Sequence, residues 1–188
     1  MYRLAFLKRP LKVIFQNDDD RKLLIRLSKL DRKKSILIKG SGVDLNVFSS
    51  KPFPKGRPKV TMISRLQKDK GVVEFVEAAE LLKEEGVEAD FWLIGERDSS
   101  YPASISEKES LIWREEGNVK ILGFRKDISS LISKSHMIVL PSYREGMPKI
   151  LLEASSCGRP IITTNVPGCR DAIVEGKTGI LIPVQNSV

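Results

Sequence analysis

The chain has 188 residues, of which 41% are hydrophobic and 30% are charged, and its formal net charge is +8. This length suffices for one α/β domain with its own core, and this composition is typical of a soluble globular protein. No segment approaches the roughly 18 apolar residues of a membrane-spanning helix. The start, MYRLAFLKRPLKVIF, lacks a clean apolar core and a small-residue cleavage site, so we expect no signal peptide. The two cysteines, Cys157 and Cys169, have no metal-like spacing, and we expect reduced thiols in a cytoplasmic protein.

The positive charge is concentrated in the first third of the chain. Residues 1–59 contain 16 Lys/Arg and 5 Asp/Glu, whereas the remaining residues contain 16 and 19. A basic segment favours an anionic membrane surface or a phosphorylated ligand, although a solvated basic lead-in explains it equally well. We expect no nucleic-acid partner, because aromatic residues are only 6% of the chain and none alternates with the basic residues as a stacking platform requires.

The first 58 residues predict a small unit followed by a linker. In chain order we expect a strand at 11–16, a helix from the N-cap cluster Asn17–Asp20 to about Leu30 with Leu23, Leu24, Leu27 and Leu30 on one face, and a strand at Ser35–Lys39. The segment GSGVDLNVFSSKPFPKGRPK that follows is rich in Gly, Pro and Ser, which is typical of a domain boundary.

From Lys59 onward, strands and helices alternate. We expect six strands, at Lys59–Ser64, Asp90–Gly95, Val119–Phe124, Met137–Leu140, Pro160–Thr164 and Ile180–Pro183. The helices between them are expected at Lys70–Glu85, in a segment reaching about Glu116, at Asp127–Lys134, from Pro148 to Cys157, and at Arg170–Glu175. This order predicts an α/β fold with a Rossmann-like parallel sheet and helices on both faces.

The stretch PSYREGMPKILLEASSCGRPIITT, residues 141–164, carries the strongest chemical signal. Glu145 lies just before a helix that we expect to open at Pro148, as its first helical residue, where free N–H groups and the helix dipole favour an anion. Glu153 follows eight residues later, inside the helix. Two such carboxylates can hold two parts of one polar ligand while the amides between them take its negative charge. Taken alone, the spacing also fits a solvated helix.

A basic pair follows the first strand of the alternating region. Arg65 and Lys70, in SRLQKDKG, lie five residues apart at a strand exit, where the ligands of parallel sheets bind. A guanidinium fork and a compact ammonium both suit a diphosphate, although a basic helix start is an equally good explanation from spacing alone. Gly95, after the second strand, would allow the backbone to approach a ligand closely.

These motifs resemble the retaining glycosyltransferases of family 4, which have the GT-B fold. The resemblance rests on the E-x7-E spacing within REGMPKILLEASSCGRPIITT and on SRLQKDKG, and it extends from about Val13 to Pro183. It implies a remnant of the N-terminal acceptor domain with the interdomain linker at 1–58. It also implies a nucleotide-sugar donor domain at 59–188 that lacks its terminal helices. The motifs are most similar to those of bacterial enzymes that extend polyprenyl-diphosphate-linked glycans, typically from UDP-sugars.

The resemblance also implies a role for each site residue. Arg65 and Lys70 would neutralise the diphosphate, although Ser64 stands where Gly or Ala is commoner in the family. Glu145 would face the donor sugar and diphosphate together with the backbone of Gly146, Met147 and Pro148. Glu153 would hold the ribose, and backbone groups around Arg125, in the segment 123–127, would meet the nucleobase. The family also has a glycine at the position of Gly95.

The implied reaction is transfer of a hexosyl or N-acetylhexosaminyl unit, with retention, to a glycan or lipid-linked acceptor. No metal or other cofactor is expected. Because GT-B sites lie between two domains, we expect this chain alone to bind the donor nucleotide without transferring sugar. A non-catalytic nucleotide-sugar-binding subunit stays open as an alternative, whereas an epimerase is disfavoured because His136 is the single histidine.

Three further polar residues have weaker signals. Arg170 is a candidate contact for an acidic ligand at a strand exit. Asp127 is better explained as a helix N-cap than as a ligand. His136 leads into a strand and is expected to be structural.

Overall fold

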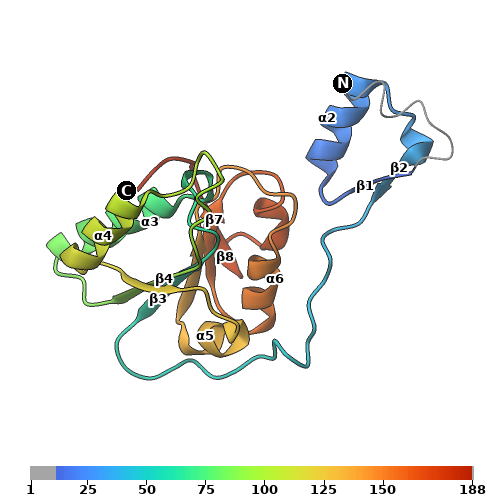
Figure 1. Ribbon diagram of the computed structural model, residues 1–188. Helices are drawn as coiled ribbons and strands as arrows, with labels where there is room; N and C mark the ends of the chain where they lie inside the picture. The colour runs from blue at the N-terminus through green and yellow to red at the C-terminus, as the bar shows by residue number, and fades with distance from the viewer. Residues whose placement is uncertain (1–11, 188) are drawn as a thin grey trace.

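The computed structural model describes residues 12–187, which form two separate β-sheets (Figure 1). The smaller sheet pairs β1 (Val13–Phe15) with β2 (Ser35–Leu37) in parallel. Between these strands lie α2 (Asp18–Ser28) and the short 3-10 helix η1 (Arg32–Lys34). Residues 1–11 lie outside the described part, and so does most of the segment on which the signal-peptide prediction rests.

The helix α2 begins where the sequence predicts. The Asn17 side chain accepts a hydrogen bond from the Asp20 N–H at 2.8 Å, and three aspartates occupy the first turn, where the helix dipole favours negative charge. The helix ends at Ser28 because Lys29 adopts a left-handed conformation with φ of 56°. The apolar face is only partly covered, since Leu23 and Leu27 are 38% and 57% exposed.

The larger sheet confirms the predicted Rossmann-like α/β fold. Its six strands are all parallel, in the order β5-β4-β3-β6-β7-β8. They are β3 (Lys59–Ile63), β4 (Asp90–Ile94), β5 (Lys120–Gly123), β6 (Met137–Leu140), β7 (Ile161–Thr164) and β8 (Gly179–Ile182). The chain runs outward from β3 to β5, crosses back, and then runs outward from β6 to β8. The strand order therefore reverses between β3 and β6, at the position where open parallel sheets bind their ligands.

Helices cover both faces of this sheet. The connections are α3 (Val72–Glu84), α4 (Glu107–Glu116), α5 (Ile128–Lys134), α6 (Lys149–Ser156) and the 3-10 helix η3 (Arg170–Ala172). Right-handed crossovers put α3 and α4 on one face and α5 and α6 on the other, as Figure 1 shows. Among residues 12–187, no helix combines the length and the apolar character needed to cross a membrane.

Two helix starts differ from their predicted positions. Lys70 belongs to a separate 3-10 turn, η2 (Lys68–Lys70), and α3 begins only after Gly71. A Cβ atom on Gly71 would lie 2.2 Å from the Pro141 carbonyl oxygen, so a close approach to the end of β6 enforces the break. Pro148 is the N-cap of α6 rather than its first helical residue. The short helix expected at Arg170–Glu175 is confined to η3.

The core lies between the sheet and its helices. Its most deeply buried side chains are Met62, Leu93, Ile132, Ile138, Leu140, Leu151 and Ile161. Both cysteines are buried and free. His136 has a structural role, because its Nδ1 accepts a hydrogen bond from the Lys59 N–H at 3.0 Å.

The Gly/Pro/Ser-rich linker is fixed to the larger sheet. The buried guanidinium of Arg159 donates to the carbonyl oxygens of Lys51 and Pro52, at 3.0 and 2.9 Å. Phe48 is buried in the core, and its carbonyl accepts a hydrogen bond from Ser156. These contacts hold the segment between the two sheets against the α5–α6 face.

Candidate functional site

The loops after β3 and β6 meet at the reversal of strand order. The Lys70 ammonium donates to the Glu145 carboxylate at 2.6 Å, and both side chains are only 16% exposed. The Tyr143 N–H donates to the Asp69 carbonyl at 2.9 Å, which joins the same two loops through their backbones. A cation and a carboxylate from distant parts of the sequence are therefore fixed at the carboxyl end of the two central strands.

The backbone of the Glu145 loop is supported by the loop that follows β7. A Cβ atom on Gly168 would lie 2.4 Å from the Gly146 carbonyl oxygen and 2.7 Å from that of Glu145, so only glycine permits this contact. Thr164, at the end of β7, donates its hydroxyl to the Ser142 carbonyl. Met147 is buried, and Pro148 then caps α6. The peptide groups before α6 therefore have a defined position.

Arg65 lies at the end of β3 but does not join the Lys70–Glu145 pair. Its guanidinium carbon is 6.0 Å from the centre of the Tyr101 ring, and the Tyr101 hydroxyl donates to Asp69 at 3.1 Å. Within residues 12–187, Arg65 forms no ion pair, in contrast to Lys70. Its charge is therefore available to an anion at this edge of the sheet.

Glu153 is a buried carboxylate on α6. Its side chain is 9% exposed and contacts the exposed ammonium of Lys149 at 3.3 Å. Burial raises the pKa of Glu153, an effect that Lys149 only partly offsets. Perturbed carboxylates in such positions are concentrated at functional sites.

A cavity of about 260 Å³ lies at the carboxyl ends of β3, β4 and β5. Its lining includes Arg97, Gly123 and Gly95, the last being the glycine predicted to allow close approach of the backbone to a ligand. Position 95 also requires glycine for a structural reason, because a Cβ atom there would lie 1.7 Å from the Ser64 carbonyl oxygen.

The Arg125 side chain points to a different partner. Its guanidinium makes two hydrogen bonds of 2.8 Å to the Asp127 carboxylate and does not line the cavity. The prediction that Asp127 caps α5 is wrong for its side chain, because Asp127 occupies the N-cap position without accepting a helix N–H. The adjacent guanidinium competes for the carboxylate and holds the pKa of Asp127 below its usual value.

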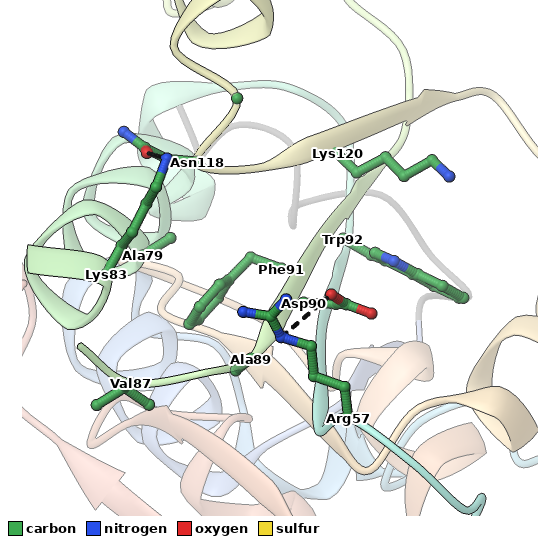
Figure 2. Close-up of a pocket in the computed structure, with 11 residues that line it drawn as sticks. Arg57, Ala79, Lys83, Val87, Ala89, Asp90, Phe91, Trp92, Asn118 and Lys120 are labelled. Carbon is green, nitrogen blue, oxygen red and sulfur yellow. Dashed lines mark hydrogen bonds and ion pairs between the residues drawn. The ribbon is translucent and has the colours of Figure 1, made fainter.

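A larger cavity, about 390 Å³, lies at the opposite end of the sheet (Figure 2). It is formed around the starts of β4 and β5, and Trp92 and Lys120 contribute to its lining. Four of its polar residues already form two pairs, since Arg57 lies 3.7 Å from Asp90 and Lys83 donates to Asn118 at 2.8 Å. Ligands of open parallel sheets bind at the other end of the strands, so we place the candidate site at the reversal of strand order.

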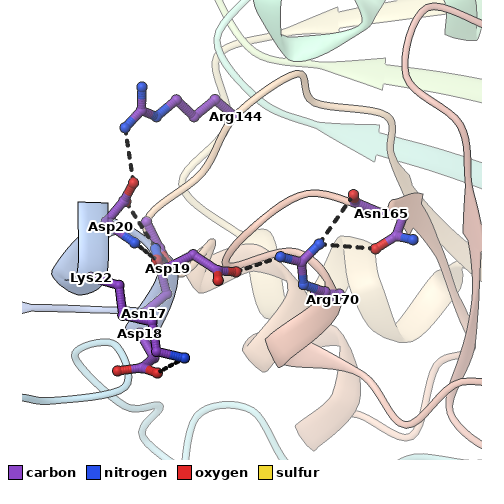
Figure 3. Close-up of polar contacts among 9 residues, drawn as sticks. Asn17, Asp18, Asp19, Asp20, Lys22, Arg144, Asn165 and Arg170 are labelled. Carbon is purple, nitrogen blue, oxygen red and sulfur yellow. Dashed lines mark hydrogen bonds and ion pairs between the residues drawn. The ribbon is translucent and has the colours of Figure 1, made fainter. Parts of the chain in front are cut away.

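We call the elements β1, α2, η1 and β2 the N-terminal unit. Side chains of this unit contact the loops of the candidate site, and the sequence does not predict these contacts (Figure 3). Arg170, predicted to meet an acidic ligand, pairs with Asp19 of the same chain and with the Asn165 side chain at 3.1 Å. Asn17 donates to the Gly146 carbonyl at 2.9 Å, and Asp20 pairs with Arg144 at 2.8 Å. In the sequence, the start of a helix fully explains Asn17, Asp19 and Asp20. Nothing in the sequence therefore indicates that these side chains also contact the loops after β6 and β7.

Residues 57–188 match the family model described as glycosyl transferases group 1. The chain belongs to this family. The resemblance found in the sequence is thereby confirmed, and the match includes both the Lys70–Glu145 pair and the 260 Å³ cavity.

Two relatives match nearly the whole chain. One is the N,N'-diacetylbacillosaminyl-diphospho-undecaprenol alpha-1,3-N-acetylgalactosaminyltransferase of Campylobacter jejuni, 34% identical over 100% of this chain and 50% of the relative. The other is the UDP-Gal:alpha-D-GlcNAc-diphosphoundecaprenol alpha-1,3-galactosyltransferase of Escherichia coli, 29% identical over 93% of this chain and 48% of the relative. The chain therefore spans about half the length of these two glycosyltransferases.

Solved structures share the fold. The crystal structure of Anabaena HepE in complex with UDP and glucose has a TM-score of 0.81, with 22% identity, and covers 99% of this chain and 52% of that one. The C-terminal domain of the group 1 glycosyl transferase LpcC from Francisella tularensis has a TM-score of 0.65 and 23% identity, covering 78% of this chain and 82% of that domain.

Proposed function

We propose that this chain forms the donor-binding half of a glycosyltransferase that uses a nucleotide-diphosphate sugar. The observation that carries the proposal is the Lys70–Glu145 pair, which is only 16% exposed and lies where the strand order reverses. A UDP-sugar is the proposed donor, supported by a relative named for UDP-Gal and by a structural neighbour solved with UDP. The transferred unit is a hexosyl or N-acetylhexosaminyl group.

The proposed chemistry is stabilisation of negative charge on the departing diphosphate. Arg65 and Lys70 provide two cations at the exit of β3, and α6 begins directly after the Glu145 loop, so the N–H groups of its first turn would lie near the same edge. Glu145 holds the ammonium in place, so that a bound diphosphate would share a cation whose position is already fixed. This gives the charge stabilisation that would otherwise require a metal ion, and we propose that none is used.

The nucleoside is assigned to the two remaining features. Glu153 would accept hydrogen bonds from the ribose hydroxyls, because a carboxylate presents acceptors only. The cavity beside Gly95 and Gly123 would hold the base, with backbone groups near Arg125 at its edge. We propose transfer with retention at the anomeric carbon, as in the family that the motifs resemble.

We assign the acceptor-binding site to the part of the enzyme that would form the other side of the cleft beside the donor site. A glycan or polyprenyl-diphosphate-linked acceptor is proposed, since both relatives described above are named for acceptors carried on diphospho-undecaprenol. The described chain alone would bind donor nucleotide without transferring sugar. The basic residues of the first third would favour peripheral contact with the cytoplasmic face of an anionic membrane.

Titration calorimetry with UDP, GDP and ADP tests the donor site. We expect UDP to bind, and Lys70→Ala and Arg65→Ala each to weaken binding by about 10-fold or more, because a hydrogen bond to a charged group contributes roughly 1.5–3 kcal/mol. Lys68→Ala is the matched control, since Lys68 belongs to the same turn but pairs with Glu109. Absence of nucleotide binding, or an equal loss in the Lys68 variant, would contradict the proposal.

A further inference from the structure

We propose that Asn17, Asp19 and Asp20 are positioning residues for the donor loop, which we define as residues 144–147. They belong to the N-terminal unit, and they fix this loop from outside the sheet that carries it (Figure 3). The effect on the donor rests on the proposed function, whereas the effect on the loop does not. In this arrangement, the contacts of the N-terminal unit hold the donor loop in the conformation that binds the nucleotide.

Asn17 is the centre of the contact. It is fully buried, and its Oδ1 accepts from the Asp20 N–H while its Nδ2 donates to the Gly146 carbonyl at 2.9 Å. One amide therefore joins the first turn of α2 to the peptide that follows Glu145. Loss of its Nδ2 group would leave the Gly146 carbonyl without this partner, which is unfavourable in a partly buried position.

Two ion pairs flank this hydrogen bond. Asp20 contacts Arg144 at 2.8 Å, and Asp19 contacts Arg170, which is anchored on Asn165. The first pair reaches the donor loop, and the second reaches the loop after β7 that supports it. Because these side chains are partly exposed, each pair alone is weak, and the buried Asn17 amide is the principal contact.

Steric contacts leave the donor loop little room. A Cβ atom on Gly146 would lie 2.4 Å from the Gln16 Oε1 on one side, and Gly168 packs against the Gly146 carbonyl on another. Lys70 then holds the Glu145 side chain at 2.6 Å. Displacement of Gln16 and Asn17 would remove one wall of this enclosure, and the position of Glu145 would become less defined.

The expected consequence is reciprocal coupling. If the seated N-terminal unit favours the loop conformation that binds nucleotide, nucleotide binding must favour the seated unit to the same extent. Residues that do not belong to the nucleotide site would then affect its affinity.

The test uses the ¹⁵N-labelled chain and measures backbone relaxation with and without UDP. In the variant Asn17→Ser the hydroxyl still caps α2 but is too short to retain the amide's donor. We expect the order parameters of residues 145–147 to fall from about 0.85 toward 0.6 or below, and the UDP dissociation constant to rise about 3- to 10-fold. Asp19→Asn combined with Asp20→Asn should have a smaller effect that disappears at high salt.

Asp18→Asn is the matched control. Asp18 lies in the same helical turn but pairs with Lys22 of its own helix at 2.7 Å, so its replacement should leave the donor loop unchanged. Unchanged order parameters in the Asn17 variant, or an equal effect in the Asp18 control, would overturn the positioning role even if UDP binds. If the wild-type chain does not bind UDP, the donor assignment fails, and the relaxation data still decide whether Asn17 positions the loop.

Discussion

At the scale of single residues, Glu153 shows a conflict between stability and the proposed function. Its carboxylate is buried and its pKa is raised, so the folded state holds the proton more tightly than the unfolded state. The free energy of unfolding therefore falls as the pH rises through the range between the unfolded and folded pKa values. Because the charged carboxylate is unfavourable for folding at neutral pH, stability does not explain a glutamate at this position. The proposed contact with the ribose does.

The variant Glu153→Gln tests this conflict. We expect its melting temperature at pH 7 to equal or exceed that of the wild type, because a neutral amide avoids burial of the charge, while UDP binding weakens. The difference in melting temperature should shrink as the pH falls through the range between the folded and the unfolded pKa, and should no longer change below about 4.5. Glu115→Gln, on the exposed part of α4, should change neither quantity. A clearly destabilised Glu153 variant with intact nucleotide binding would show that the residue is structural.

At the scale of elements, α4 is held by a reciprocal pair of hydrogen bonds at its start. The Ser106 hydroxyl accepts from the Glu109 N–H at 3.1 Å, and the Glu109 carboxylate accepts from the Ser106 N–H at 2.7 Å. These hydrogen bonds, assisted by Lys68, lower the pKa of Glu109 to about 2. The lowered value means that the carboxylate stabilises the fold above pH 4.5, and that this contribution is lost as the pH falls toward 2.

Urea unfolding measures both parts of this cap. We expect Ser106→Ala to lower the free energy of unfolding at pH 7 by about 1 kcal/mol. Glu109→Gln retains a capping side chain without the charge, so it should lose part of the dependence of stability on pH between 4.5 and 2. A Glu109 variant whose pH dependence equals that of the wild type would contradict the assignment.

Much of the element order follows from the sequence because it depends on local signals. Apolar runs of strand length alternate with helical periodicity from Lys59 onward, and this order predicts the parallel sheet and the strand exits at which Arg65, Lys70 and Glu145 lie. The 3-10 turn before α3 was not predictable, because Gly71 breaks the helix through a contact with Pro141. The Asp127 side chain leaves its cap position for a comparable reason, since Arg125 offers a stronger, charged partner.

At the scale of the whole molecule, the contacts between the two units could not be predicted. Asn17 and Gly146 are 129 positions apart, and a complete local explanation, the N-cap, already accounts for Asn17. The same holds for Arg170, whose acidic partner is Asp19 rather than a ligand. A residue with one satisfied local role gives no signal of a second role that only the tertiary structure creates.

If a nucleotide diphosphate binds where the strand order reverses, an NMR titration of the ¹⁵N-labelled chain with UDP should locate it there. We predict that the largest shift changes occur at residues 64–71 and 145–148, with further changes around Gly95 and Gly123. The Trp92 indole N–H, in the 390 Å³ cavity at the other end of the sheet, should stay unchanged. Shift changes centred on Trp92, Asn118 and Lys120, with none at the loops after β3 and β6, would contradict the account.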